Sequence, residues 1–390
     1  SNITININGK DYQTDSSNTV LKACREAGID IPTLCYHEQL EPYGSCFLCT
    51  VEIKGAKTRY TVSCGTKVRD GMEVRTDTKE IWNQRKMALE LLLSNHYADC
   101  RAPCYNECPS HVDVQAYIAA IAEEDYHEAV KIIKETNPFP AVCGRVCTRP
   151  CEDECRRNLV DSRVGIDFLK RYASDKDLAS QFAFTPDIKD SKEKKIAVIG
   201  AGPSGLSAAY YLAIEGYDID VFEMYEKAGG MLRYGIPQYR LPDDVLDTEI
   251  KQITDLGPEI HYSQRLGRDF TLDELKEKGY DSIYIAIGAH ECMYMGIEND
   301  DAEGAWGGID LLRDVAAGKD IDLGRDVVVV GGGNTAIDAA RVSRRLGCNV
   351  SMVYRRTVKE MPAHDAEIED AQEEGIDIKF LTNPVKVIKD

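Results

Sequence analysis

The sequence predicts a multidomain protein that begins with a small mixed β domain, continues with a cysteine-rich helical domain and ends with an α/β region. Eleven of the 14 cysteines lie between Cys35 and Cys155, and glycine-rich motifs occur near residues 200 and 331. After the linker, strands and helices alternate, which is typical of a parallel sheet. The expected parts are domains at 1–78, 79–173, 196–290 and 291–390 (the last one truncated) and a charged linker at 174–195.

Composition limits the functional class. The 390-residue chain has a formal net charge of -19, which argues against a nucleic-acid partner because phosphate requires a basic surface. No run approaches about 18 apolar residues, so we expect no membrane span. The chain opens without a signal peptide, so we expect a cytoplasmic protein whose thiols bind metal. Cys24, Cys292 and Cys348 stand apart and are expected to be buried small hydrophobic residues.

The first domain is expected to consist of short strands and one helix. The segments ITINING, TVEIKG, TRYTVSC and MEVRTDT predict strands, and TVLKACREAG predicts a helix ending at Gly28. Residues 79–94 change to helical periodicity. The spacing C-x10-C-x2-C-x14-C is formed by Cys35, Cys46, Cys49 and Cys64. Four thiolates suit zinc or an iron–sulfur cluster, although a zinc ribbon would pair two C-x2-C sequences and only one occurs here.

The helical domain contains one histidine and seven cysteines at regular intervals. Steps of four residues separate His96, Cys100, Cys104 and Cys108, and then Cys143, Cys147, Cys151 and Cys155. Two [4Fe–4S] clusters need eight ligands, so His96 would complete the seven thiols. The alternative for His96 is a helix-end histidine bonded to the backbone. We expect helices at 112–135 and 164–173.

A dinucleotide motif follows the linker in KKIAVIGAGPSGLSAAYYLAIEGYDIDVFE, residues 194–223. Its turn contains Gly200, Gly202, Pro203, Ser204 and Gly205. This G-x-G-x-x-G pattern brings a pyrophosphate to a helix N-terminus. Glu223 ends the second strand, where a carboxylate accepts a ribose hydroxyl. A glycine-rich turn without a ligand is the alternative, which the complete strand–helix–strand context disfavours.

A second motif occurs in DVVVVGGGNTAIDAARVSRRLGCNVSMVYRR, residues 326–356. The predicted contact residues are Gly331, Gly333, Asn334, Thr335 and Ala336. Tyr354 stands where the first motif has its acid, and Arg355 and Arg356 follow. Because the ribose acceptor is missing and arginines suit a 2′-phosphate, the motif favours NADP(H). The alternative is a solvated pair of surface arginines.

The first domain resembles a known iron–sulfur module. PTLCYHEQL, GSCFLCTVEI, VSCGTKVRDGMEVRTDT and RKMALELLLSNH are similar to the N-terminal [2Fe–2S] module of the large iron–sulfur subunit of respiratory complex I and of iron hydrogenases. The resemblance implies a β-grasp fold whose ligands are Cys35, Cys46, Cys49 and Cys64. In complex I a histidine ligand stands at the junction that His96 occupies here.

Residues 97–172 resemble the helical domain of the glutamate synthase small subunit and dihydropyrimidine dehydrogenase, which carries two [4Fe–4S] clusters. That family often supplies a Glu or Gln ligand before an Arg-Tyr pair. Lys170 stands there in this chain and is a poor iron ligand, so Cys143 is the natural substitute. We group His96, Cys100, Cys104 and Cys155 as one ligand set, the Cys104 group. We group Cys108, Cys143, Cys147 and Cys151 as the other, the Cys143 group.

KAGGMLRYGIPQYRLP resembles the second FAD-binding stretch of the same flavoproteins, in which Gly230 and Leu232 approach the flavin. The resemblance implies an NAD(P)H:acceptor oxidoreductase subunit that carries FAD, NADP(H), one [2Fe–2S] cluster and two [4Fe–4S] clusters. No acid–base or nucleophilic catalytic residue is expected.

The expected partner is a redox protein or catalytic subunit: a ferredoxin, a dehydrogenase, a hydrogenase or a synthase large subunit. The alternative is a non-enzymatic iron–sulfur electron-transfer subunit of a larger complex of the formate dehydrogenase, hydrogenase or bifurcating type. The family's chain normally continues beyond this point and returns to the FAD domain, so we expect the flavoprotein part to be C-terminally incomplete.

Overall fold

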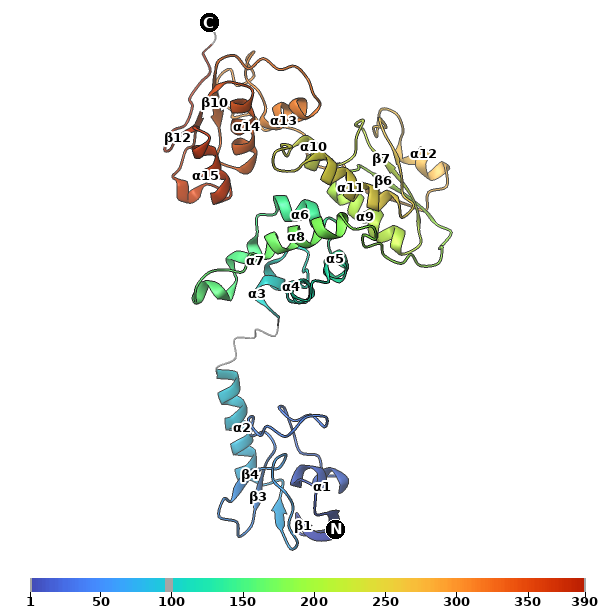
Figure 1. Cartoon of the computed structure of the whole chain (residues 1–390), viewed down its shortest axis with the longest axis vertical. Helices are drawn as coiled ribbons and strands as arrows, with labels where there is room; N and C mark the ends of the chain where they lie inside the picture. The colour runs from blue at the N-terminus through green and yellow to red at the C-terminus, as the bar shows by residue number, and fades with distance from the viewer. Residues whose placement is uncertain (1, 95–100, 389–390) are drawn as a thin grey trace. The chain divides into compact units, whose positions relative to one another are not determined.

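The chain forms two compact units, Ser1–Cys100 and Arg101–Asp390. The structure is a computed structural model that describes residues 2–94 and 101–388 (Figure 1). Among these residues no helix is both long enough and apolar enough to cross a bilayer.

Unit 1 contains a mixed five-stranded sheet with helix α1 packed on it, which is the β-grasp arrangement, and helix α2 contacts strand β3 through Arg85. The strand order is β2-β1-β5-β3-β4. The elements are β1 Asn2–Ile7, β2 Lys10–Asp15, α1 Val20–Glu26, β3 Thr50–Ile53, β4 Tyr60–Val62, β5 Glu73–Arg75 and α2 Lys79–Ser94. Strand β1 pairs antiparallel with β2 and parallel with β5. The core lies between sheet and helix and includes Ile5, Leu21 and Val51.

Two local features of unit 1 explain its boundaries. Gly28 has φ +75° just after α1, which confirms the predicted helix end. Strand β2 was not predicted, because its sequence KDYQTD is almost entirely polar. It forms because Asn8 and Gly9 have φ values of 53° and 87° and turn the chain into a tight hairpin.

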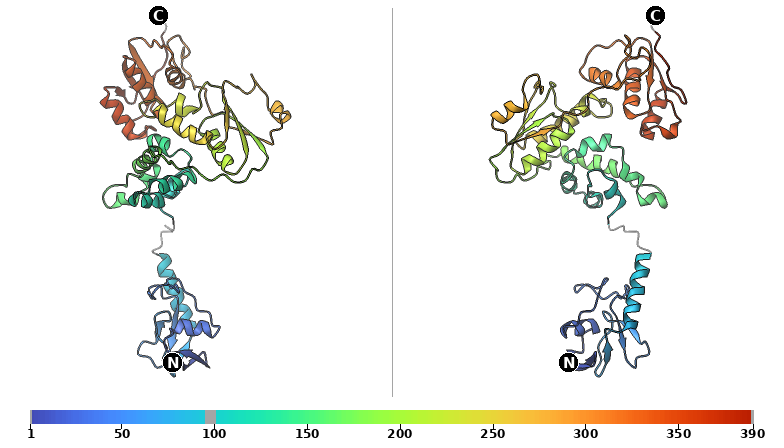
Figure 2. Two further views of the ribbon diagram at one scale, coloured as in Figure 1. Left: turned by 45° about the vertical axis from the view of Figure 1, so that its right-hand side comes forward. Right: turned by 180° about the vertical axis from the view of Figure 1, so that it is seen from behind.

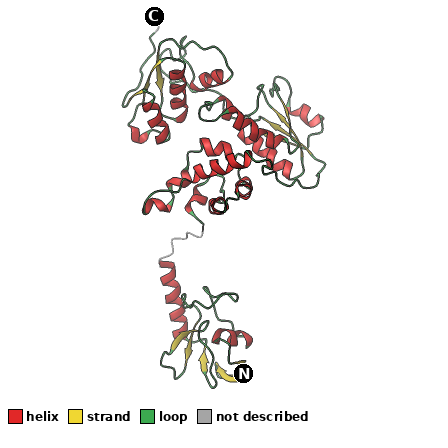
Figure 3. Cartoon of the chain, viewed as in Figure 1, coloured by secondary structure: helices red, strands yellow, loops and turns green. Residues whose placement is uncertain are grey.

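The first part of unit 2 is built from helices, drawn in red in Figure 3. They are α3 Pro103–Glu107, α4 Val114–Ala122, α5 Tyr126–Lys134, α6 Pro140–Val146, α7 Pro150–Asp153, the 3-10 turn Arg156–Leu159 and α8 Ile166–Leu178. The helical region expected at 112–135 is two helices, because Glu124 has φ 61° and Asp125 caps a new N-terminus. Helix α8 runs past residue 173 because Ser174 and Asp177 are buried.

The first α/β part contains a parallel sheet of order β8-β7-β6-β9. Its strands are β6 Lys195–Ile199, β7 Asp218–Phe222, β8 Glu259–His261 and β9 Ser282–Ile285, and its helices are α9 Pro203–Ile214, α10 Met231–Tyr234, α11 Asp243–Thr254 and α12 Leu272–Glu277. Val198 and Val221 face a core shared with α9 and α11, whereas Ala197 and Phe222 face Leu275 of α12. Helices therefore cover both faces of this sheet (Figures 1 and 2).

The helical part is not separated from this α/β part. Phe139 and Val142, at the start of α6, belong to the same core as Val198. In addition, Glu249 of α11 accepts hydrogen bonds from the backbone N–H groups of Ala141 and Val142, at 2.9 and 2.8 Å. The beginning of α6 is thus built into the α/β part.

The second α/β part has a parallel sheet of order β10-β11-β12 within the described residues. Its elements are α13 Gly308–Ala316, β10 Asp326–Val330, α14 Asn334–Arg345, β11 Asn349–Val353, the 3-10 turn Val358–Glu360, α15 Asp365–Glu373 and β12 Asp377–Lys379. Arg240 connects the two α/β parts through ion pairs with Asp338 at 2.6 Å and Glu367 at 3.1 Å.

Candidate functional site

The four cysteines predicted to bind the [2Fe–2S] cluster lie together in unit 1. Burial, a hydrogen bond with Cys49 and the nearness of the other three thiols raise the pKa of Cys64 to about 12. Three of the four are buried, and Cys35 is partly exposed. The backbone N–H of Cys46 and the hydroxyl of Ser45 donate to the Cys35 sulfur and lower its pKa to about 7. A thiolate is the form that binds metal, so this donor set fits the predicted [2Fe–2S] cluster.

In unit 2 each of three short helices begins with proline and carries a predicted cysteine ligand. Cys104 lies on α3, Cys143 on α6 and Cys151 on α7. Further predicted ligands follow where these helices end, namely Cys108, Cys147 and Cys155. Proline fixes the first helical turn, and the backbone is extended at Cys108, Cys147 and Cys155, so none of these three lies within a helix. The regular four-residue step therefore results from repeated short helices.

The predicted thiol ligands that the structure describes in the helical part of unit 2 fall into two neighbourhoods. Burial is the main reason that the Cys104 pKa is raised, and the thiol of Cys155 adds to the effect. Cys151, whose pKa burial raises to about 12, lies close to Cys147 and Cys108. Burial also raises the pKa of Cys143, and the nearby thiol of Cys147 adds to this rise. The Cys104 and Cys143 groups remain predictions as ligand sets, and His96 and Cys100 lie outside the described residues.

Two hydrogen bonds orient thiols of the Cys143 group. The sulfur of Cys147 accepts from the backbone N–H of Arg149 at 3.3 Å. Arg149 adopts the left-handed conformation, with φ 62°, which is uncommon for a residue with a side chain. The Cys143 thiol lies 3.7 Å from the Oδ1 atom of Asn137. The N–H bond to Cys147 is of the kind that adjusts the reduction potential of an iron–sulfur cluster, whereas the Cys143 thiol donates to Asn137 only while it keeps its proton.

Lys170 approaches the same group from α8. Its ammonium lies 2.9 Å from Asp167 Oδ1, and its side chain is only 12% exposed. Burial opposes the charged form, but Asp167 and the thiols of Cys143 and Cys147 raise the Lys170 pKa above its ordinary value. At position 170, where the resembled family often has a Glu or Gln ligand, the structure thus places a buried cation near these cysteines.

The first glycine motif forms a close-packed turn between β6 and α9. A Cβ on Gly205 would lie 1.9 Å from the carbonyl oxygen of Gly200, so a side chain there would force the turn to move. A Cβ on Gly230 would lie 2.7 Å from the Gly202 Cα. The two stretches predicted to bind FAD, around Gly202 and Gly230, are therefore in contact across a surface that carries no side chains. A pyrophosphate fits such a cradle at the start of α9.

The other residues predicted to bind FAD lie around the turn between β6 and α9, at the end of β7 and on α10. Pro203 is the first residue of α9, and the hydroxyl of Ser204 lies 3.0 Å from that of Tyr284. Glu223 follows β7 and is buried, with its carboxylate accepting from the backbone N–H groups of Ala201 and Tyr225 at 2.8 Å each. Leu232 on α10 is partly buried against the core. Their roles toward FAD remain predictions.

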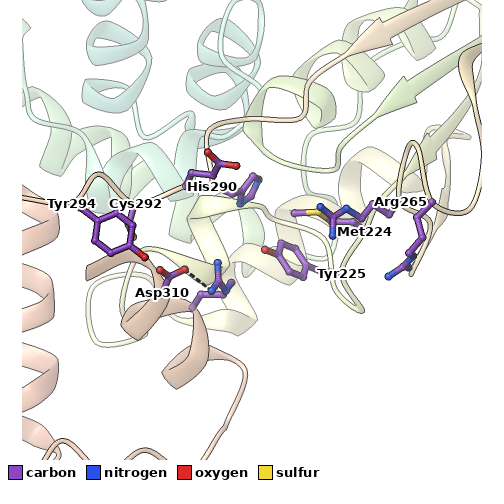
Figure 4. A pocket seen from close by; sticks show the side chains of 10 residues that line it. Met224, Tyr225, Arg265, His290, Cys292, Tyr294 and Asp310 are labelled. Carbon is purple, nitrogen blue, oxygen red and sulfur yellow. Dashed lines mark hydrogen bonds and ion pairs between the residues drawn. The ribbon is translucent and has the colours of Figure 1, made fainter. Parts of the chain in front are cut away.

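A pocket of about 580 Å³ opens directly after Glu223, a size suited to a cofactor fragment. Figure 4 shows Tyr225 in its middle, Arg265 toward one end and Tyr294 with Asp310 toward the other. The Nδ1 atom of His290 is buried and has no hydrogen-bond partner within the described chain. Sequence reasoning missed this pocket, because its lining comes from four separate loops and helices that share no motif.

The second glycine motif joins β10 to α14. Gly331 and Gly333 precede α14, and Asn334, Thr335 and Ala336 form its first turn. The Asn334 side chain accepts from the backbone N–H of His364 at 3.1 Å, so it is occupied in holding the loop before α15. Ala336 belongs to the edge of the core below the sheet.

The strand β11 ends at Val353, as β7 ends before Glu223, and Tyr354 takes the place of the acid. Tyr354 is buried, and its hydroxyl donates to the Glu360 carbonyl at 2.6 Å. The next two residues, Arg355 and Arg356, are exposed. Their side chains are therefore open to a ligand phosphate at the carboxyl end of the sheet, where dinucleotides bind.

Three family models match successive parts of the chain. A 2Fe-2S iron-sulfur cluster binding domain matches residues 1–79, and the dihydropyrimidine dehydrogenase domain II with its 4Fe-4S cluster matches 79–182. The pyridine nucleotide-disulphide oxidoreductase model matches 194–390, half of the chain. The predicted order of iron–sulfur and nucleotide-binding domains is thereby confirmed.

Curated relatives match about three quarters of this chain. The chain is 46% identical over 295 residues to NADPH-Fe(3+) oxidoreductase subunit beta of Geobacter sulfurreducens, covering 74% of this chain and 44% of that protein. It is 42% identical over 313 residues to NADP(+)-dependent formate dehydrogenase subunit beta of Moorella thermoacetica, with the same coverages of 74% and 44%. It is 35% identical over 300 residues to the glutamate synthase [NADPH] small chain of Escherichia coli K12, covering 73% and 63%. The chain thus spans about half the length of the first of these relatives.

Proposed function

The chain belongs to the pyridine nucleotide-disulphide oxidoreductase family, and from that premise we propose that it transfers electrons between NADPH and a redox partner by way of FAD and three iron–sulfur clusters. The observation that carries the proposal is the shared core of α6 and the first α/β part. Cys143 lies on α6, so a predicted cluster ligand is anchored in the domain that carries the first dinucleotide motif. Such anchoring holds two redox groups at a fixed separation.

The protein's own residues would place and separate the redox groups. FAD, when bound, supplies the exchange of an electron pair for single electrons, chemistry that no side chain provides. The glycine cradle at Gly202 and Gly230 would hold the pyrophosphate, and Glu223 the adenosine ribose. Arg355 and Arg356 would bind the 2′-phosphate of NADPH. The three thiol groups would hold the clusters.

The partner is proposed to be a second subunit with its own catalytic site. The Geobacter and Moorella relatives are named as beta subunits, one of a formate dehydrogenase, and the Escherichia coli relative is a small chain of glutamate synthase. A dehydrogenase, hydrogenase or synthase subunit, or a ferredoxin, would each exchange single electrons with the clusters. Electrons could run in either direction between this partner and the nicotinamide.

The deciding experiment counts cofactors on protein purified without oxygen. We expect about ten irons per chain, the sum of one two-iron and two four-iron clusters, together with one flavin. NADPH should bleach the flavin absorbance and then the cluster absorbance. Cluster absorbance without flavin would favour the non-enzymatic electron-transfer subunit. Zinc in the thiol sites, or cysteines joined as disulfides, would contradict the proposal.

A further inference from the structure

We propose that Lys170 is a potential-setting residue: a buried positive charge that raises the reduction potential of the cluster in the Cys143 group without ligating iron. The inference rests on the proposed function, because it requires a cluster at these thiols. It adds a role for a residue that lies on α8, outside the predicted ligand set.

The placement of Lys170 follows from how closely α6 and α8 approach each other. A Cβ on Gly144 would lie 2.7 Å from the Cα of Arg171, so the two backbones touch where residue 144 faces residue 171. Cys143 and Lys170 are the preceding residues on the two helices. The close contact therefore brings the segments that carry Cys143 and Lys170 together, and a larger residue at position 144 would push the two helices apart.

The ammonium group of Lys170 is largely shielded from solvent and is paired with a buried carboxylate. Its side chain is 12% exposed, and Asp167, at 2.9 Å, is 1% exposed. Asp167 is also 3.4 Å from the Nε atom of Arg149, whose backbone N–H donates to Cys147. Two cations thus share one carboxylate beside the thiols. Glu249 accepts from the backbone N–H groups of Ala141 and Val142 at the start of α6 and opposes these cations only when its carboxyl group is ionised.

The sign of the effect follows from electrostatics. Reduction adds one electron, so a nearby positive charge stabilises the reduced cluster more than the oxidised one and raises the potential. The effect is stronger in a buried site than in water, because the effective dielectric constant is lower. A protonated ammonium has no free electron pair, so Lys170 cannot ligate iron while it is paired with Asp167.

The test is a redox titration of the [4Fe–4S] signals by electron paramagnetic resonance, on the full chain purified without oxygen. Lys170→Met should keep the iron content and shift the midpoint potential of one cluster to lower values. Asp167→Asn, which retains the lysine, should shift the same cluster to higher values. Lys170→Arg should restore a potential near that of the unmodified protein. Lys176→Met, at an exposed position of the same helix, is the matched control and should change nothing.

Two results would overturn the inference. The first is an unchanged potential in both Lys170→Met and Asp167→Asn. The second is loss of about four irons in Lys170→Met and also in Lys170→Arg, which would make Lys170 a ligand or a structural requirement. If the unmodified protein holds no [4Fe–4S] cluster, the proposed function fails with it. A protein that holds the clusters but shows no shift in these variants loses only the role of Lys170.

Discussion

Arg355 and Arg356 are the residues by which the second glycine motif is predicted to differ from the first. Both are exposed and directly follow Tyr354, which replaces the acid of the first site. We predict that Arg355→Ala combined with Arg356→Ala raises the KM for NADPH about tenfold or more, since a charged hydrogen bond to phosphate contributes roughly 1.5–3 kcal/mol. The KM for NADH should hardly change, because NADH lacks the 2′-phosphate.

Steady-state assays with both nucleotides measure this preference. Lys359→Ala serves as the control, because Lys359 is an exposed cation of the following 3-10 turn. Equal changes for NADPH and NADH would contradict a 2′-phosphate site and would favour a solvated arginine pair.

Single residues were the most predictable part of this protein. The spacing of Cys35, Cys46, Cys49 and Cys64 identified four thiols that the structure brings together, because ligand spacing is a local property of the chain. The surroundings of Lys170 were not predictable in the same way. They depend on the contact of α6 with α8, which involves residues far apart in sequence.

At the scale of elements, the turn between β6 and α9 has steric limits that differ from one glycine to the next. Ala at position 205 would place its Cβ 1.9 Å from the Gly200 carbonyl, whereas at 202 the nearest atom is 3.7 Å away. We predict that Gly205→Ala loses flavin and lowers the free energy of unfolding by about 1–3 kcal/mol, the usual cost of overpacking. Gly202→Ala should lose flavin alone, because its methyl group enters only the space kept for the ligand.

Flavin content and thermal melting, measured on both variants, test this distinction. Helix propensity alone would make Gly205→Ala stabilising by up to about 1 kcal/mol, since residue 205 lies within α9. A stable Gly205→Ala protein that still binds flavin would therefore refute the proposed cradle.

The contact between α6 and α11, which Glu249 makes, predicts that the stability of unit 2 depends on pH. Burial raises the pKa of Glu249 to about 7, although its two backbone hydrogen bonds and the nearby Lys134 and Arg145 oppose the shift. A raised folded-state pKa means that the stabilising contribution is complete below the unfolded pKa of about 4.5 and is lost as the pH rises through about 7. The melting temperature of unit 2 should therefore fall between pH 5 and pH 8.

Melting curves across this range, monitored by circular dichroism, should show a smaller fall in Glu249→Gln than in the unmodified protein. The variant starts from a lower stability, because its amide can accept only one of the two backbone hydrogen bonds. Glu259→Gln removes a carboxylate that is 75% exposed and should keep the full pH dependence. An unchanged slope in Glu249→Gln would contradict the assignment.

Element boundaries were only partly predictable, for reasons visible in the sequence. The polar strand β2 shows no apolar alternation, so the Asn8-Gly9 turn is the only local sequence feature that indicates it. Helices α4 and α5 share one apolar pattern, and the break between them depends on Glu124 and Asp125. The joining of α6 to the first α/β core could not be predicted, because neither segment carries a signal for the other.

At the scale of the whole molecule, we predict that the two units carry out different steps of electron transfer. Unit 2 contains both glycine motifs and the described thiols of the Cys104 and Cys143 groups, whereas unit 1 contains one thiol group with a partly exposed Cys35. We predict that Cys64→Ser removes about two irons per chain but leaves NADPH-dependent bleaching of the flavin and reduction of the [4Fe–4S] clusters intact. Cys24→Ala, which changes a buried thiol of the same unit outside the ligand set, should keep all the iron.

The informative measurement is electron transfer to a one-electron protein acceptor such as a ferredoxin. If unit 1 provides the exit, Cys64→Ser should lose most of this transfer while its flavin is still reduced by NADPH at the original rate. If the acceptor is reduced as fast as before, electrons leave from unit 2, and the two-iron group does not lie on the route to that acceptor. Loss of NADPH-dependent flavin reduction in Cys64→Ser would show instead that the units do not act separately, because the change would then reach a site in the other unit.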